Sequence, residues 1–246
     1  MIESVTLHNA DCFDIFPTIA DGCVDLVCAD IPYGTTQCRW DSMLDLSLMW
    51  EQLYRIAKPT AAIVLFSAQP FTSVLVASNL RHWRSEWIWE KGNATGFLNA
   101  KKQPLRAHEN IEVFYRRQPT YNPQMTDGHI RKTSKRKTVN SECYGKALSL
   151  TEYDSTKRYP RDVQFFSSDK QTGNFHPTQK PLSLVKYIIE TYSNRGDVVL
   201  DFTMGSGTAG IACQQTDRSF IGIEKEQDIF EVACMRIGIS RKERAA

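Results

Sequence analysis

The chain has 246 residues, of which 41% are hydrophobic and 24% are charged, and its formal net charge is +2. This composition is typical of a globular protein and excludes a mostly disordered chain, and the length suits one large domain or a domain with an insertion. No apolar run approaches the roughly 20 residues of a transmembrane helix, and the Met1-Ile2-Glu3 start does not resemble a signal peptide. We therefore expect a soluble, cytoplasmic protein with no membrane partner. The cysteines form no C-x-x-C pair, so we expect neither disulfide bonds nor a metal site.

Apolar runs alternate with amphipathic segments in the first half of the chain, as in an α/β protein. Strands are expected at 4–9, 24–29, 61–66, 83–90 and 111–115. Between them we expect a helical turn over 13–19, an amphipathic helix over 43–57 capped by Ser42, and a helix that begins at Pro70. The polar stretch 91–102 is too long for a simple turn and is interpreted as a functional or mobile loop.

Hydrophobic periodicity fades between 118 and about 173, and this segment is basic. Residues 101–161 contain 14 Lys and Arg but only 6 Asp and Glu, whereas the remainder of the chain is net acidic. This asymmetry indicates contact with a polyanion in one part of the molecule. We interpret 118–173 as an insertion, because it has too few apolar residues for a core of its own.

Regular periodicity returns at Pro181 with an amphipathic helix. A strand (197–201), a glycine turn, a helix to about 216, a second strand (220–224) and a helix to about 239 follow, which form a βαβ unit. The sequence therefore predicts one α/β domain over 1–246 with a doubly wound, mostly parallel sheet of about seven strands. The two strands within 83–115 are expected to form its edge pair.

The tetrapeptide Asp30-Ile31-Pro32-Tyr33 follows a buried strand directly, at the sheet edge where α/β proteins bind ligands. It resembles the D-P-P-Y motif of DNA amino-methyltransferases, with Ile31 in place of the first proline. These enzymes transfer a methyl group from S-adenosylmethionine to the exocyclic amine of adenine or cytosine. Taken alone, the tetrapeptide is explained equally well as a strand that ends in an acid and a Pro-Tyr turn.

The resemblance implies a catalytic role for each residue of this tetrapeptide. The Asp30 carboxylate and the Ile31 carbonyl would accept the two amine hydrogens and so draw the amine lone pair out of conjugation with the base. Pro32 restricts the backbone of Ile31, which restores part of the rigidity of the missing proline. Tyr33 offers a flat face for a base that has swung out of the duplex.

A strand, a glycine turn, a helix and a second strand that ends in Glu224 form a nucleotide-binding arrangement. The turn lacks the full G-x-G-x-x-G spacing, which argues against a dinucleotide-dependent dehydrogenase. It resembles the methyltransferase motif D-P-F-x-G-x-G-T, with Phe202 and Thr203 in place of Pro and Phe. The resemblance implies that S-adenosylmethionine contacts Asp11, Asp30, Asp201, Thr203, Gly205, Ser206, Gly207, Thr208 and Glu224.

A third motif, His176-Pro177-Thr178-Gln179-Lys180-Pro181, precedes the amphipathic helix. It is similar to an element that holds the methionine end of the cofactor in this family, which adds His176, Thr178 and Lys180 to the expected cofactor site. The motifs Gln69-Pro70-Phe71 and His108-Glu109-Asn110 look like family elements near the flipped base. The motif order resembles the β group of the family, in which the catalytic half comes first. Membership implies the class I methyltransferase fold, with the strands before Asp30 and Gly205 adjacent.

The resemblance implies a DNA methyltransferase that modifies the N6 amine of adenine, because Asp at the first motif position is commoner in adenine enzymes. N4-cytosine methylation is the first alternative, and a non-catalytic DNA-binding protein with a relic cofactor pocket is the second. RNA or a protein glutamine amide as substrate also stays open. The partners expected are double-stranded DNA and, as an option, a second copy of the chain in a homodimer.

DNA contacts are expected from the basic segment, which we assign to target recognition. The candidate cations are Lys101, Lys102, Arg106, Arg131, Lys132, Lys135, Arg136 and Lys137. Lysine and arginine contact mainly phosphates, which position the protein without specifying sequence. The alternative is that this charge run is only a solvated surface loop.

Overall fold

The computed structural model describes residues 4–34, 43–136, 139–142, 145–147, 151–167 and 179–239. The chain divides into two compact units, of which the first comprises Met1–Asn122 with Asp162–Ala246 and the second Pro123–Arg161. The first unit contains a large sheet and the helices, and the second contains two small two-stranded sheets. No helix in the described part of the chain is both long and apolar enough to cross a membrane.

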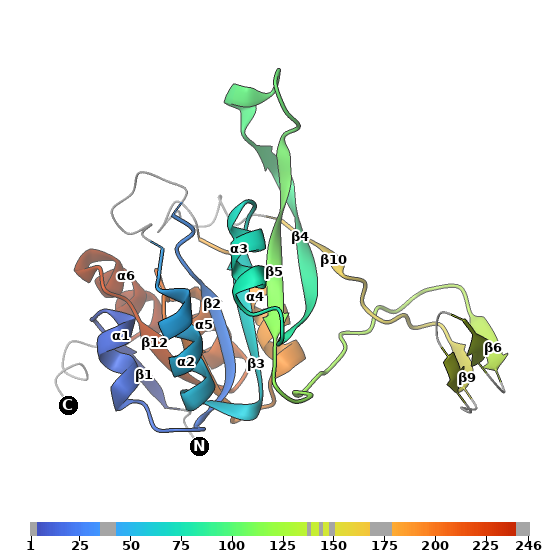
Figure 1. Cartoon of the computed structure of the whole chain (residues 1–246), viewed down its shortest axis with the longest axis horizontal. Helices are drawn as coiled ribbons and strands as arrows, with labels where there is room; N and C mark the ends of the chain where they lie inside the picture. Colours follow the sequence, from blue (N-terminus) through green and yellow to red (C-terminus); the bar gives the residue numbers. More distant parts are fainter. Residues whose placement is uncertain are drawn as a thin grey trace. The chain divides into compact units, whose positions relative to one another are not determined.

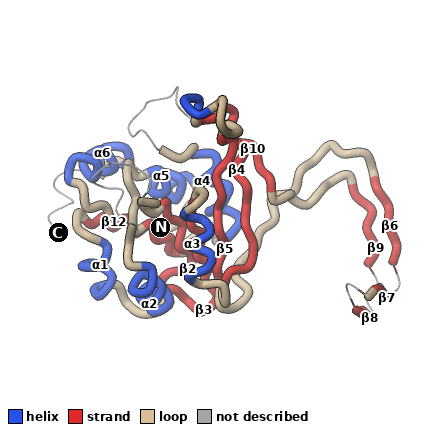
Figure 2. The backbone as a smooth tube through the Cα atoms, turned by 45° about the horizontal axis from the view of Figure 1, so that its top comes forward, coloured by secondary structure: helices blue, strands red, loops and turns tan. Residues whose placement is uncertain are grey.

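The first unit is built on an eight-stranded sheet (Figure 2). In spatial order its strands are β1 (Val5–His8), β12 (Ser219–Ile223), β11 (Val198–Asp201), β2 (Val24–Asp30), β3 (Ala57–Ser67), β5 (Arg106–Phe114), β4 (Trp83–Thr95) and β10 (Val163–Phe166). Strand β5 pairs antiparallel with both of its neighbours, and the other neighbouring pairs are parallel. The sheet is therefore mostly parallel, as the sequence predicts.

Helices cover both faces of this sheet (Figure 1). One face packs against α1 (Cys12–Ile15), the 3₁₀ turn η1 (Phe16–Thr18), α2 (Leu46–Ile56) and α3 (Phe71–Ser78), and the other against α4 (Leu182–Tyr192), α5 (Thr208–Gln215) and α6 (Gln227–Ile237). Strand β2 contributes to both layers, because Leu26 and Cys28 lie in one core and Val27 and Ala29 in the other. Successive side chains of a strand point to opposite faces, so a strand buried on both sides reads as a continuous apolar run. The doubly wound α/β fold is confirmed.

The central pair of strands comes from distant parts of the chain. Strand β11 lies parallel to β2, with Val199 opposite Leu26 and Leu200 opposite Val27. The expected adjacency of the strands before Asp30 and Gly205 is thus confirmed. Because both strands end at the same edge of the sheet, the tetrapeptide and the glycine turn meet there.

The sheet has one more strand than the predicted seven. The additional strand, β10, lies within 118–173 and pairs parallel with β4, so the two strands within 83–115 are not an edge pair. Its four residues are too few to show a period, and only Phe166 of its two aromatic residues packs against the core. The prediction was wrong here because β10 forms by pairing with the open edge of β4. The local sequence of β10 does not reveal that this edge is available.

Two local predictions were also wrong. Helix α2 begins at Leu46, and its cap is Asp45, whose Oδ1 accepts a hydrogen bond of 3.0 Å from the Leu48 amide, whereas Ser42 lies outside the described residues. The stretch expected to be a loop from 91 onwards instead continues β4 as far as Thr95, which pairs with Arg106 of β5. The two strands form a long hairpin that is closed by the 3₁₀ turn η2 (Phe97–Asn99). Cross-strand pairing maintains this polar segment as strand, although its sequence lacks apolar alternation.

The second unit consists of short antiparallel pairs. Strand β6 (Lys132–Arg136) pairs with β9 (Thr151–Ser155), and β7 (Val139–Ser141) pairs with β8 (Gly145–Ala147). Its strands are mostly polar, which is why hydrophobic periodicity does not reveal them. The role of the larger segment 118–173 as an inserted recognition element stays a prediction.

Candidate active site

The Asp30 carboxylate, at the carboxyl end of β2, has a partner on each oxygen. The Tyr33 hydroxyl donates to Oδ1 at 2.8 Å, and the Lys180 ammonium donates to Oδ2 at 2.6 Å. The Asp30 carbonyl accepts a hydrogen bond of 3.1 Å from the Thr203 hydroxyl, which belongs to the turn after β11. Three motifs that are far apart in the sequence therefore meet at one residue, Asp30.

Lys180 is 9% exposed and lies between two carboxylates, because its ammonium is also 3.2 Å from Glu109 Oε2. Glu109 in turn forms an ion pair with Lys91. Burial lowers the pKa of Lys180, but Asp30 and Glu109 outweigh it and hold this pKa above its usual value. Burial likewise raises the pKa of Glu109, but Lys180 and Lys91 bring it below its usual value. Lys180 and Glu109 are therefore both ionised at neutral pH.

Three aromatic rings lie beside this cluster. The rings of Tyr33 and Phe71 stack with centroids 5.4 Å apart and an interplanar angle of 20°. The Lys180 ammonium lies 5.8 Å from the centre of the Tyr33 ring and 5.4 Å from that of Phe66. Flat apolar faces beside hydrogen-bond acceptors are what a nucleic-acid base requires of a pocket.

The glycine turn after β11 is held by the acid at the end of the next strand. The Gly205 amide donates to Glu224 Oε2 at 3.0 Å, and the Glu226 amide donates to Glu224 Oε1 at 2.8 Å. Gly207 has φ +78°, and a Cβ there would lie 2.9 Å from Ile237 Cδ1, so a side chain is excluded for two reasons. The turn therefore has a defined shape, and the Glu224 carboxylate, which has about four lone-pair sites, can still accept a hydrogen bond from a further donor.

Acidic groups dominate this edge of the sheet. Burial raises the pKa of Asp201 well above its usual range, the Thr203 amide opposes this shift, and the negative charges of Asp30 and Glu224 add to it. Burial also raises the pKa of Glu224, although the amides of Glu226 and Gly205 oppose it. A ligand that carries hydroxyl groups could donate hydrogen bonds to these carboxyl groups, so this set of acceptors fits such a ligand.

Other residues predicted to bind the cofactor have structural partners. Asp11 caps α1, because its Oδ1 accepts a 3.0 Å hydrogen bond from the Phe13 amide. Ser206 and Thr208 are buried, and the Arg236 guanidinium donates to the Ser206 carbonyl and hydroxyl, each at 2.6 Å. These contacts fasten the glycine turn to α6. His176 and Thr178 lie outside the described residues.

The cations predicted to bind DNA lie in both units. Lys101, Lys102 and Arg106 are exposed at the end of the β4–β5 hairpin, in the first unit. In the second unit, Arg131 donates to the two oxygens of Asp154 at 2.7 and 2.6 Å, and Lys135 lies 3.6 Å from Glu152. Lys132 is exposed on β6. The Arg136 side chain and Lys137 lie outside the part that the structure describes.

Two site residues, Lys91 and Glu109, are not among the cofactor-binding and catalytic residues that the sequence predicts. They lie on the antiparallel strands β4 and β5, 18 positions apart, and pair across the hairpin. The motif His108-Glu109-Asn110 is the only sequence signal that marks one of them, and Lys91 becomes visible only once the register is known.

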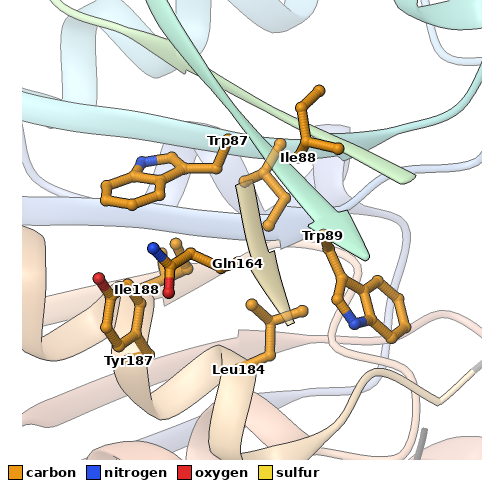
Figure 3. Close-up of a pocket in the computed structure, with 8 residues that line it drawn as sticks. Trp87, Ile88, Trp89, Gln164, Leu184, Tyr187 and Ile188 are labelled. Atoms are coloured by element: carbon orange, nitrogen blue, oxygen red, sulfur yellow. The ribbon is translucent and has the colours of Figure 1, made fainter. Parts of the chain in front are cut away.

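The concave feature drawn in Figure 3 is separate from this site. It is a packing gap without room for a water molecule, lined by Trp87, Ile88, Trp89, Ile111, Gln164, Leu184, Tyr187 and Ile188. The indole N–H of Trp87 donates to the Tyr192 hydroxyl at 2.8 Å, and that of Trp89 to the Phe166 carbonyl at 2.9 Å. The two tryptophans thus join α4 and β10 to the sheet.

The potential metal ligands in the described part of the chain are dispersed. Within the described residues no group of three or more His, Cys, Asp or Glu side chains is arranged to hold a metal ion. The cysteines in the same ranges, Cys12, Cys23, Cys28, Cys213 and Cys234, are free thiols.

Known proteins resemble this chain in sequence and in fold. The type II methyltransferase M.HpaI of Haemophilus parainfluenzae is 27% identical over 233 residues, which cover 89% of this chain and 69% of that protein. The structure of an M1.HpyAVI–SAM complex has a TM-score of 0.67 at 23% identity and covers 96% of this chain and 100% of its own. The cytosine-N4-specific PvuII DNA methyltransferase has a TM-score of 0.69 at 13% identity and covers 100% of this chain and 91% of its own.

The fold is thus that of the class I methyltransferases. The family model described as DNA methylase, whose name refers to N6 and N4 methyltransferases, matches residues 24–235. That range begins with β2 and ends within α6, so it includes the tetrapeptide, the Lys180–Glu109 cluster and the glycine turn. The chain therefore belongs to the N6/N4 DNA methylase family.

Proposed function

We propose that this DNA methylase transfers a methyl group from S-adenosylmethionine to the N6 amine of an adenine that has been flipped out of duplex DNA. The observation that carries the proposal is the junction of β2 and β11, where the Thr203 hydroxyl donates to the Asp30 carbonyl at 3.1 Å. This contact holds the amine-accepting tetrapeptide against the glycine turn of the cofactor half.

The cofactor half fits S-adenosylmethionine. Glu224 lies beside Gly205, where its carboxylate can accept a hydrogen bond from a ribose hydroxyl. S-adenosylmethionine supplies a methyl group on a sulfonium, from which a neutral thioether departs as an excellent leaving group. Asp11, His176, Thr178 and Lys180 complete the proposed set of contacts.

The chain's own residues then prepare the amine for attack. The Asp30 carboxylate and the Ile31 carbonyl accept the two N–H hydrogens, which localises the lone pair on the nitrogen. The ring of Tyr33, stacked on Phe71, positions the base. The remaining contribution is alignment in a pocket with little water.

The target amine has to compete with the present partners of Asp30, because each carboxylate oxygen already accepts one hydrogen bond. Lys180 can leave Asp30 at little cost, since Glu109 at 3.2 Å offers a second carboxylate for the ammonium. The Lys180 ammonium has no free lone pair, so Asp30 is the nearest acceptor for the proton that the methylated amine releases.

N4-cytosine methylation is the second candidate. The cytosine-N4-specific PvuII enzyme shares the fold, and an exocyclic amine of cytosine presents the same pair of hydrogens to Asp30. We favour adenine because the first motif position is Asp in this chain, which is commoner among adenine enzymes.

A homodimer also belongs to the proposal and is tested by sedimentation.

Incubation with methyl-labelled cofactor and duplex DNA, followed by mass spectrometry of the nucleosides, tests the function. We expect labelled N6-methyladenine, and N4-methylcytosine would establish the alternative. Asp30→Ala should abolish transfer while the protein still binds the cofactor. Transfer that persists in this variant would refute the role of Asp30. A wild-type protein that binds DNA without affinity for the cofactor would instead be the relic-pocket protein.

A further inference from the structure

The β4–β5 hairpin presents apolar side chains to solvent at its end. We call residues 96–106 the hairpin tip. Phe97 is 82% exposed, Leu98 is 98% exposed and Leu105 is 41% exposed. Clustered apolar side chains with this exposure mark an interaction site more often than a single exposed residue does.

The charges around these side chains are of one sign. Residues 92–107 contain Lys101, Lys102 and Arg106 and no Asp or Glu. Cations next to apolar side chains complement a nucleic acid, which offers phosphates on its outside and apolar base faces inside. The tip also turns through Gly96 at φ +91°, a backbone conformation that glycine adopts readily.

The same two strands connect the tip to the active site (Figure 1). Lys91 of β4 and Glu109 of β5 belong to the cluster around Lys180, and beyond them the ladder continues to the pair of Thr95 and Arg106. Arg106 lies three positions before Glu109, which corresponds to about 10 Å along a strand. This length is comparable with the depth of a DNA groove, about 8 Å. When a base is bound at Asp30, the duplex from which it came would therefore lie within reach of the tip.

We propose that the hairpin tip is a wedge that enters duplex DNA beside the target base. Phe97 and Leu98 occupy space between bases when the target leaves the stack, and Lys101, Lys102 and Arg106 contact the neighbouring phosphates. The inference rests on the proposed function. Apolar side chains inserted at a base step offset the loss of stacking when a nucleotide is extruded.

The double variant Phe97→Ala with Leu98→Ala tests the wedge on two duplexes that differ only at the target. In one the target adenine is paired with thymine, and in the other it faces a mismatched base, which lowers the cost of flipping. We expect turnover at saturating DNA to fall by about tenfold or more on the paired duplex and by less than about threefold on the mismatched one. Leu80→Ala, which also removes an exposed apolar side chain (65% exposed), is the matched control and should behave as wild type on both.

A second variant separates the apolar role from the ionic one. Lys101→Ala with Lys102→Ala should lower the salt slope of DNA binding by about one unit for each phosphate that the variant no longer neutralises, without selective rescue by the mismatch. An equal loss of turnover on both duplexes, or no loss in the Phe97/Leu98 variant, would overturn the wedge. So would a change in its sedimentation coefficient, because the tip would then join two copies of the chain. Failure of the proposed function can be distinguished from failure of the wedge, because the wild-type protein would then methylate neither duplex.

Discussion

The Asp30 carboxylate of this methylase already accepts a hydrogen bond on each oxygen before any substrate arrives. Asp30 accepts from Tyr33 at 2.8 Å and from Lys180 at 2.6 Å, so an incoming amine competes with groups of the protein itself. Hydrogen bonds to ionised groups are stronger than neutral ones, and the ammonium is therefore the harder partner to displace. Glu109 lowers this barrier because it is a second anion for Lys180 to pair with.

Substitution of Glu109 tests this positioning role. In Glu109→Gln the ammonium keeps only one ionised partner, so it should stay on Asp30 and oppose binding of the amine. We expect kcat to fall by about tenfold, with the KM for DNA and the cofactor dissociation constant within about threefold of wild type. Steady-state methyl transfer measures the first two constants, and a cofactor titration measures the third.

Two further variants show whether the charge or the fold is responsible. Glu109→Asp retains the anion and should recover part of kcat, whereas Glu90→Gln removes an exposed carboxylate from the neighbouring strand and should leave kcat unchanged. If Glu109→Gln raised KM and left kcat intact, Glu109 would bind DNA rather than position Lys180.

Individual site residues were predictable where a motif is contiguous. Asp30, the glycines and Glu224 lie where the sequence predicts them, at the ends of β2, β11 and β12. The ion pair of Lys91 and Glu109 was not predictable, because it depends on the register of a hairpin whose end reads as a loop. The cofactor and DNA roles of these residues stay predictions.

Strand β5 carries a buried acid that should make stability depend on pH. Burial raises the pKa of Glu112 to about 7; the Trp83 indole N–H opposes this shift and Glu86 adds to it. The indole N–H donates to Glu112 Oε2 at 2.6 Å. The native state therefore holds a proton that the unfolded chain releases near its ordinary pKa, so the free energy of unfolding falls as pH rises between about 4.5 and 7.

Replacement of this acid should remove that dependence. Glu112→Gln keeps an oxygen for the indole N–H and eliminates the charge, so we expect stabilisation at pH 8 and little change at pH 5. A rise of about 3 °C in the unfolding midpoint at pH 8 would correspond to roughly 1 kcal/mol in a chain of this length. Thermal melts followed by circular dichroism at both pH values measure the effect. Equal midpoint shifts at the two pH values would show that Glu112 is not the titrating group.

Elements with a strong apolar period were predictable to within a few residues, for example α2, α4 and β11. The apolar periodicity of these elements reflects which of their side chains are buried. It therefore locates the elements in the sequence. The outer part of β4 and the whole of β10 were not predictable, since backbone pairing rather than burial keeps these segments in strands. Their conformation depends on partners that are distant in sequence.

The charge of the whole molecule is divided unevenly between its two units. The second unit contains nine Lys and Arg and four Asp and Glu, a net charge of +5 against +2 for the chain. Ion pairs within this unit already engage part of that charge, since Arg131 pairs with Asp154 and Lys135 with Glu152. We therefore expect the unit to attract DNA with fewer effective cations than its sequence contains.

Neutralisation of Arg131, Lys132, Lys135, Arg136 and Lys137 together should weaken DNA binding steeply at low salt and leave cofactor affinity almost unchanged. The salt slope should fall by about one unit for each phosphate that is no longer neutralised, and by fewer than five units in all because of the internal ion pairs. Binding isotherms at several salt concentrations give this slope.

Asp154→Asn is the matched control, because it releases Arg131 from its ion pair and should raise both DNA affinity and the salt slope. If the neutralised variant kept the DNA affinity and the salt slope of the wild type, this segment would be only a solvated surface loop. Lys101, Lys102 and Arg106 would then be the first candidates for the DNA-binding surface.

At the scale of the whole molecule, the fold class and the order of the halves were predictable because three motifs mark the ends of three strands. The strand count was not, since it depends on β10.

The pairing of β11 with β2 has a consequence for how the protein is made. A ribosome releases β2 and β3 long before β11, so the nascent chain holds a central, apolar strand with one edge open until residues 198–201 emerge. An unpaired apolar edge is prone to association with other chains, and contacts of long sequence separation form slowly. The arrangement that makes β11 the neighbour of β2 in the finished protein thus exposes β2 to association during synthesis, which chaperones or fast completion of the chain would limit.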